Sequence, residues 1–268
     1  MLFRRLSPLV FLAFASFAAG CAPEADAVDA DQEPLDVAQQ AESIPGFSVP
    51  AGVGVLIPQT LPLVKEIYAH EAKAWIKWAM GLPFSTGPIT DTTGAACGQG
   101  QSGPVWYLAG TPGGALTRSC TIPRHKFLFV PLINHWVLPD PQYVSTPADL
   151  ADYKNFIAGY IPDLRAHTCN LAIKVDGAPL LTTEAQLDAK LWTQVTNPFT
   201  VVVNDDNFAS QYGQLGYTTP AGVTAGHYAL LRPLSPGTHL LEYSGAMCDD
   251  LGAVEFENSI VLNLTVAP

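Results

Sequence analysis

The stretch Cys97-GQGQSGPVWYLA-Gly110 has two interpretations, a catalytic loop around Ser102 or the approach to a buried strand. A hydrolase nucleophile elbow has the pattern G-x-S-x-G between a strand and a helix. Here Gly100-Gln-Ser-Gly-Pro104 ends in proline and precedes an apolar run. Because proline lacks the N–H that a following helix needs but can begin a strand, the stretch predicts a strand over 104–108 and argues against a Ser102 nucleophile.

Two neighbouring aromatic residues of this predicted strand must point in opposite directions. Successive side chains of a strand alternate between the faces of a sheet, so Trp106 and Tyr107 cannot both face the core. Aromatic side chains that stay exposed can stack on sugar rings, which makes Trp106, Tyr107 and Trp136 candidates for ligand contact, together with Gln101 in the open loop. Core packing explains the same aromatic residues without a ligand.

One helix is expected over 61–80, where apolar residues recur at steps of three and four. Pro62 suits a first turn, and Gly81 supplies a stop. Glu71 lies inside the apolar stripe of this helix, so its carboxylate must be hydrogen-bonded, paired or exposed in a groove. We take Glu71 as the leading candidate for a catalytic acid, with Asp91 or Glu257 as its partner.

The rest of the chain predicts a mainly β domain. Short runs rich in branched and aromatic residues alternate with turns, which favours a β-sandwich resembling a jelly roll, with one N-terminal amphipathic helix. Short inserted helices are expected over 147–161, ending before Pro162, and over 184–192. The predicted strands are 104–108, 127–133, 171–175, 199–204, 227–231, 239–243 and 259–266.

The N-terminus is typical of an export signal. Arg4 and Arg5 precede an apolar run, and small residues lead into Cys21. Ala-Ala-Gly-Cys resembles a bacterial lipobox, which implies a signal peptide over 1–20 and a lipid on Cys21. Residue 22 is not Asp, so we expect an outer-membrane or cell-surface lipoprotein. The alternative is an ordinary secretory signal and a soluble periplasmic or secreted protein.

An acidic segment separates this cysteine from the predicted domain. Residues 22–46 hold seven Asp and Glu residues and no basic residue, within a chain of net charge −11. Such a segment buries too little apolar surface to fold, so residues 21–46 should be a solvated tether before a single domain over 47–268. We expect no nucleic-acid partner, because nucleic acid needs a basic surface.

Five cysteines support an oxidising compartment. Without Cys21 an even number remains, and we favour the pairs Cys97–Cys120 and Cys169–Cys248, since the first pair brackets one glycine-rich unit. No CxxC occurs, which disfavours zinc.

We expect neither a metal nor another cofactor. The histidines show no HxH or HExxH spacing. Asp205 and Asp206 follow an apolar strand and could offer oxygen ligands to calcium. A turn rich in Asn and Asp explains the same residues without an ion and is the interpretation we favour.

Several motifs resemble a group of exported bacterial proteins. Its members share a GQSGPVWFLAG-like core, matched by Gly100–Gly110, and a VPAGK-FFP-like strand, matched by Ile122–Pro131. The segment Leu231–Leu240, with Pro-Gly-Thr-His, resembles their closing hairpin. The resemblance covers most of 60–267 and implies a secreted β-rich fold without implying an activity. Arg124-His125 replaces the Ala-Gly of the pattern.

These observations favour a lipid-anchored envelope or surface protein that binds an extracellular ligand, such as a glycan, or has a structural role. The membrane, through the lipid, and a glycan or envelope component are the expected partners. The alternative is a polysaccharide-acting hydrolase or lyase with a carboxylate site near Glu71. Two carboxyl groups about 5–10 Å apart in a groove would favour the enzyme.

Overall fold

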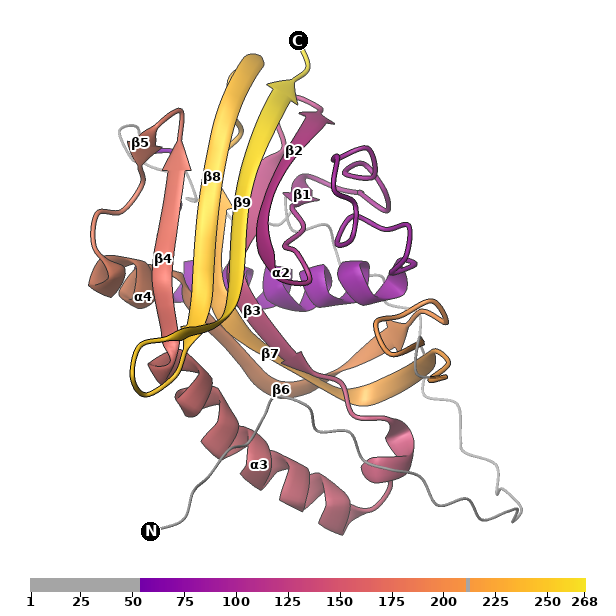
Figure 1. Ribbon diagram of the computed structural model, residues 1–268. Helices are drawn as coiled ribbons and strands as arrows, with labels where there is room; N and C mark the ends of the chain where they lie inside the picture. Colours follow the sequence, from indigo (N-terminus) through magenta and orange to yellow (C-terminus); the bar gives the residue numbers. More distant parts are fainter. Residues whose placement is uncertain (1–53, 211–212) are drawn as a thin grey trace. The chain divides into compact units, whose positions relative to one another are not determined.

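Two β-sheets enclose the main core of the protein (Figure 1), and the computed structural model describes residues 54–210 and 213–268. Sheet A has the strand order β1-β3-β7-β6, and sheet B has the order β2-β9-β8-β4-β5. The strands are β1 (Val105–Tyr107), β2 (Gly114–Ile122), β3 (Phe127–Val137), β4 (Thr168–Val175), β5 (Ala178–Pro179), β6 (Trp192–Val203), β7 (Tyr217–Leu231), β8 (Gly237–Cys248) and β9 (Val254–Val266). The helices are α2 (Pro62–Gly81), α3 (Pro147–Ala166) and α4 (Glu184–Leu191), with a 3₁₀ turn η1 (Pro141–Tyr143).

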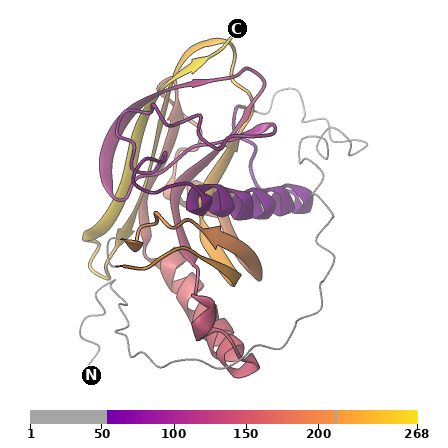
Figure 2. The same cartoon turned by 90° about the vertical axis from the view of Figure 1, so that its right-hand side faces the viewer.

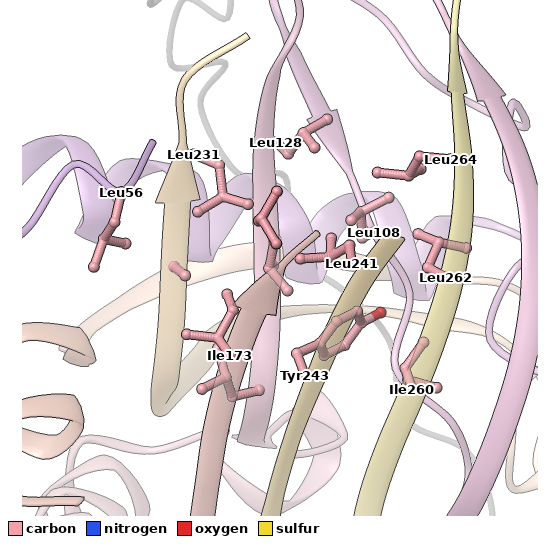
Figure 3. Packing of buried hydrophobic residues seen from close by; sticks show 14 of the residues in the cluster. Leu56, Leu108, Leu128, Ile173, Leu231, Leu241, Tyr243, Ile260, Leu262 and Leu264 are labelled. Atoms are coloured by element: carbon pink, nitrogen blue, oxygen red, sulfur yellow. The ribbon is translucent and has the colours of Figure 1, made fainter. Parts of the chain in front are cut away.

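The fold is mainly β and sandwich-like, as the sequence predicts. All strand pairs are antiparallel except β1–β3 and β2–β9, which are parallel. A jelly roll is built from antiparallel strands, so these two pairs set the topology apart from a simple jelly roll. Between the sheets, Leu128 and Leu231 from sheet A meet Ile173, Leu241 and Leu262 from sheet B (Figure 3).

Helix α2 covers the other face of sheet A (Figure 2), where its apolar stripe packs on β6 and β7. Pro62 occupies the first turn and the helix ends at Gly81, close to the predicted bounds. The alternation predicted for the opening stretch is confirmed: Trp106 packs into the core between the sheets, and Tyr107 packs on the α2 side. The β1 strand therefore contributes one aromatic ring to each core.

Both predicted disulfides are present, Cys97–Cys120 and Cys169–Cys248. They indicate folding in an oxidising compartment. Among the helices of the described residues, none is long and apolar enough to cross a membrane. The predicted signal peptide, Cys21 and the acidic tether lie outside the described residues.

Strand β2 was not predicted, because a charged residue occupies one of its core-facing positions. Arg118, Cys120 and Ile122 point inward and are buried. The guanidinium of Arg118 donates to the carbonyl oxygens of Ala109, Gly110 and Ile89 at 2.8–3.1 Å. These bonds replace the water that would otherwise solvate the buried charge. Because Arg118 occupies an inward position, the sequence of β2 lacks the apolar alternation by which a strand is recognised.

Two further expectations were wrong. Helix α3 does not stop before Pro162 but continues to Ala166, with Ile161 and Leu164 buried on its inner face. The segment resembling a closing hairpin does not pair β7 with β8. These strands belong to different sheets, and residues 232–236 carry the chain from one sheet to the other. On β8, the Nδ1 of His239 instead lies 2.8 Å from the carboxylate of Asp176, in the turn between β4 and β5.

Candidate functional site

The predicted catalytic acid Glu71 lies buried between α2 and β1. Its Oε2 accepts a hydrogen bond from the Tyr107 hydroxyl at 2.8 Å, and its Oε1 lies 3.3 Å from Nδ1 of His70. Only 1% of Glu71 is exposed, whereas 41% of the His70 side chain is exposed. Burial and the Glu71 carboxylate raise the pKa of Tyr107 well above its usual range, so this phenol stays protonated and donates.

Of the four predicted ligand contacts, Tyr107 bonds to this carboxylate and Gln101 bonds to the Tyr107 backbone, whereas Trp106 and Trp136 lie elsewhere. Gln101 accepts from the Tyr107 N–H and donates to its carbonyl oxygen, which fixes the entry to β1. Trp106 is buried on the opposite face. Trp136 is 38% exposed, with its ring 6.4 Å from that of Trp75 on α2. Trp136 is thus the predicted contact that offers an accessible ring surface.

The proposed partner acids are placed elsewhere. Asp91 accepts from the backbone N–H groups of Thr93 and Ala96 and closes its own loop. Although burial alone would raise the pKa of Asp91, these hydrogen bonds lower it to about 2. Glu257 is exposed on β9, opposite Ala246. Among the described residues, no hydrogen bond or ion pair joins Glu71 to either acid.

Asp205 and Asp206 have partners within the protein. Asp205 accepts from the Gly216 N–H at 3.0 Å, and Asp206 accepts from the backbone and hydroxyl of Ser85. Asn204 in turn accepts from the Asp206 N–H. In the part of the chain that the structure describes, no three His, Cys, Asp or Glu side chains come together as metal ligands.

A pocket of about 520 Å³ is lined by the end of α3, by α4, by β4 and by the first residues of β6. Figure 1 shows the end of α3 close to α4. Its volume is within the range usual for small-molecule sites. Apolar walls come from Pro162, Ala166, Leu171 and Ala185. We call this cavity the α3–α4 pocket.

The polar side of the α3–α4 pocket is a bonded network. Arg165 donates through Nε and one terminal nitrogen to the two oxygens of Asp188, at 2.9 and 2.8 Å. The same carboxylate lies 2.9 Å from Nε2 of His227 on β7. The guanidinium carbon of Arg165 lies 5.2 Å from the Trp192 ring centroid, and the His227 ring lies 5.0 Å from it. Each side chain is therefore held in one orientation.

Electrostatics keep this network in a single charge state. The hydrogen bond from Arg165, with the added bond from His227, outweighs partial burial and lowers the pKa of Asp188. Burial lowers the pKa of His227 more than Asp188 raises it. The imidazole is therefore neutral at neutral pH and its Nε2 carries the proton that Asp188 accepts. Its Nδ1 is buried without a hydrogen-bond partner among the described residues.

His135 on β3 pairs with Ala225, two residues before His227 on β7. The two imidazoles therefore lie on the same face of sheet A. Burial, helped by His227, lowers the pKa of His135 from 6.5 to about 4. Both imidazoles are thus uncharged at neutral pH, on the floor of the sheet that α3 covers.

We predict that acid destabilises the protein through His135. Between pH 6.5 and 4 the unfolded chain binds a proton at this residue and the folded chain does not. The free energy of unfolding therefore decreases as the pH is lowered from 6.5 to 4, by up to about 3 kcal/mol. Urea unfolding at pH 7 and pH 4.5 measures the loss, and His135→Gln should reduce it. An equal loss in this variant would contradict the prediction.

The α3–α4 pocket was missed by the sequence analysis. Arg165 and Asp188 are 23 residues apart, and Asp188 and His227 are 39 residues apart, so no motif joins them. Ending the helix before Pro162 also removed the turn that carries Arg165. Trp192 and His227 are neighbours because they pair across β6 and β7. A prediction of that strand register is the signal that would have placed the two side chains together.

Comparisons with known proteins give no family. No protein-family model and no curated protein match the chain. Among solved structures, "Structure of PbICP-C in complex with falcipain-2" matches with 10% sequence identity and a TM-score of 0.23. That match covers 61% of this chain and 99% of the other. A likeness this distant says nothing of the activity of this chain.

Proposed function

We propose that the protein binds an extracellular ligand in the α3–α4 pocket and performs no chemistry on it. The observation that supports this best is a cavity of about 520 Å³ in which Arg165 is already paired with Asp188, and Glu184 accepts from the Leu171 N–H. Asp188 and Glu184 would repel an anionic ligand, and Arg165 would repel a cationic ligand. A neutral polar ligand is repelled by none of these groups.

The unused polar groups of the pocket suit a saccharide. One terminal nitrogen of Arg165, the amide nitrogen of Gln194 and the second oxygen of Glu184 make no hydrogen bond to the described residues. They offer two donors and an acceptor beside the apolar wall. A sugar residue has hydroxyl groups that both donate and accept, and an apolar ring face, so it can satisfy both sides.

The arrangement argues against a hydrolase at the same place. Asp188 and His227 resemble part of a catalytic triad, but the free nitrogen of the imidazole faces the protein interior. A general base must reach the proton that it removes. The Thr168 hydroxyl, on the pocket wall, donates to the carbonyl oxygen of Leu164. The network therefore fixes the shape of the pocket, and the Asp188–His227 pair is a positioning element.

The proposal includes the expected location. The two disulfides agree with an exported protein. We propose that the chain is anchored by a lipid on Cys21, at the outer membrane or cell surface, and that a glycan of the envelope or the surroundings is the ligand.

The test is a saccharide-array screen with the mature chain, followed by calorimetric titration of every hit. Glu184→Gln keeps an oxygen for the Leu171 N–H, and Gln194→Ala removes the unused amide. Each should weaken binding about tenfold, the usual effect of removing one hydrogen bond to a ligand. Gln142→Ala, an exposed glutamine on η1, is the matched control and should bind as the unmodified chain does.

Two results would contradict the proposal. One is a hit whose affinity is the same in Glu184→Gln, Gln194→Ala and Gln142→Ala. The other is turnover of a saccharide that Glu71→Gln abolishes, which would favour the hydrolase or lyase with its site near Glu71.

A further inference from the structure

A second, much smaller cavity lies beside the buried Arg118 of β2. Its volume is about 20 Å³, and its walls come from the loop that carries Asp91, from the end of β1, and from β2, β8 and β9. Leu108 and Leu262 form part of its apolar side (Figure 3). One water molecule needs about 10–15 Å³ of such space. The cavity therefore has room for one molecule of that size and for nothing much larger.

The guanidinium of Arg118 brings an unsatisfied donor to this cavity. Arg118 is only 5% exposed, and its two terminal nitrogens donate to the carbonyl oxygens of Ala109, Gly110 and Ile89. Its Nε is buried and has no hydrogen-bond partner among the described residues. A guanidinium keeps its protons in proteins, so this nitrogen always carries an N–H. Because a buried donor of a charged group is costly to leave unpaired, the Nε–H calls for an acceptor in the cavity.

A carboxylate lines the same cavity without bonding to the guanidinium. In the part of the chain that the structure describes, no ion pair or hydrogen bond joins Asp91 to Arg118. The two groups are nevertheless close. Burial lowers the pKa of Arg118, and its interactions with Tyr243 and with Asp91 oppose that change. Polar groups that interact across such a gap are commonly bridged by a water molecule.

The charges around the cavity decide what it can hold. The Arg118 guanidinium would repel a cation, and the Asp91 carboxylate, with its pKa lowered to about 2, would repel an anion. A neutral molecule that both accepts and donates avoids these penalties. A third polar group is the Tyr243 hydroxyl, which donates to the carbonyl oxygen of Ala109 at 2.9 Å and keeps an oxygen that can accept. Buried waters typically make about three hydrogen bonds, which matches these three groups.

We propose that this cavity binds one water molecule, which accepts from the Arg118 Nε–H and donates to the Asp91 carboxylate and to the Tyr243 hydroxyl oxygen. The water makes Asp91 the counter-charge of the buried Arg118, which is a structural role and not a catalytic one. It also joins the Asp91 loop to β2, beside the Cys97–Cys120 disulfide and the bond from the Ser119 N–H to the carbonyl oxygen of Thr93. The proposal does not depend on ligand binding in the α3–α4 pocket.

The test is proton NMR of the whole mature chain labelled with nitrogen-15, with the Arg118 Nε–H assigned through its own side chain. A water held longer than the tumbling time of the protein gives a NOESY cross-peak between Nε–H and the water resonance with the sign of the diagonal, and a ROESY cross-peak of opposite sign. Proton exchange with the solvent gives the sign of the diagonal in both spectra. We expect the pattern of a held water.

Two variants identify the partners of the water. Asp91→Ala removes the carboxylate, so the water should exchange faster and both cross-peaks should be lost. Asp140→Ala is the matched control, because Asp140 also accepts from the backbone N–H two residues later, in a different loop, and its cross-peaks should be unchanged. Tyr243→Phe removes a hydroxyl proton that could relay the signal, and the cross-peaks should persist because Arg118 and Asp91 still hold the water. The amide spectrum verifies the fold of each variant.

Four results would overturn the proposal. They are the absence of the cross-peaks in the unmodified chain, the exchange pattern in both spectra, persistence of the held-water pattern in Asp91→Ala, and its loss in Tyr243→Phe. A titration separates water from an ion. A saturable shift of the Arg118 Nε–H resonance with sodium bromide, absent with sodium gluconate, would show that the cavity holds an anion and would also contradict the assignment.

Discussion

Replacing Cys169 and Cys248 together by alanine should lower the free energy of unfolding by about 4 kcal/mol. The bond closes a separation of 79 residues, so its loss frees a long loop in the unfolded chain. It also joins the start of β4 to the end of β8, next to Thr168 and Leu171 of the α3–α4 pocket. Denaturant unfolding of the variant under oxidising conditions measures the loss.

The other disulfide is the matched control for this prediction. Cys97–Cys120 closes a separation of only 23 residues. Its replacement should cost about 3 kcal/mol on the same chain-entropy reasoning. A larger loss from Cys97→Ala with Cys120→Ala than from the longer pair would show that loop closure does not govern the stability of this fold.

Asn258→Ala should be the most damaging change to a single polar side chain, lowering the free energy of unfolding by about 3 kcal/mol. Strand β3 has an irregularity between Pro131 and Ile133. The Asn258 amide donates to the carbonyl oxygens of Pro131 and Leu132, at 3.3 and 2.7 Å, and its oxygen accepts from the Thr111 N–H at 2.9 Å. Alanine removes all three of these hydrogen bonds.

Asn263→Ala is the control for Asn258→Ala, because it lies on the same strand and is exposed. Its amide makes one long contact, 3.5 Å, to the carbonyl oxygen of Arg118. We expect a change within about 0.5 kcal/mol, as for ordinary surface substitutions. Similar unfolding midpoints for the two variants would contradict the role assigned to Asn258 between the sheets.

Local pattern explains which parts of the fold were predictable. The spacing of Trp75 and its neighbours predicted α2, and alternation correctly separated Trp106 from Tyr107. Even numbers of cysteines and their positions gave both disulfides. Periodicity leaves a signal in the sequence because it recurs along a whole segment, and disulfides leave one because only cysteine can form them.

Long-range contacts explain what was missed. The inward Arg118 of β2 is compatible with burial because the carbonyl oxygens of Ala109 and Gly110, just before the strand, and of Ile89, 29 residues away, all accept from its guanidinium. Arg165, Asp188 and His227 meet only after α3, α4 and β7 have packed. Glu71 was correctly singled out as unusual, but its partner Tyr107 is 36 residues away and no spacing rule connects them.

The most direct test of the proposed function is the fluorine NMR spectrum of the chain labelled with 5-fluorotryptophan. The five tryptophans give one resonance each, assigned by Trp→Phe variants. Titration with a saccharide that binds should shift the resonance of Trp192, beside Arg165 in the α3–α4 pocket, and leave the other four in place. A shift of Trp136 with Trp192 unmoved would instead place the ligand beside α2 and contradict the account.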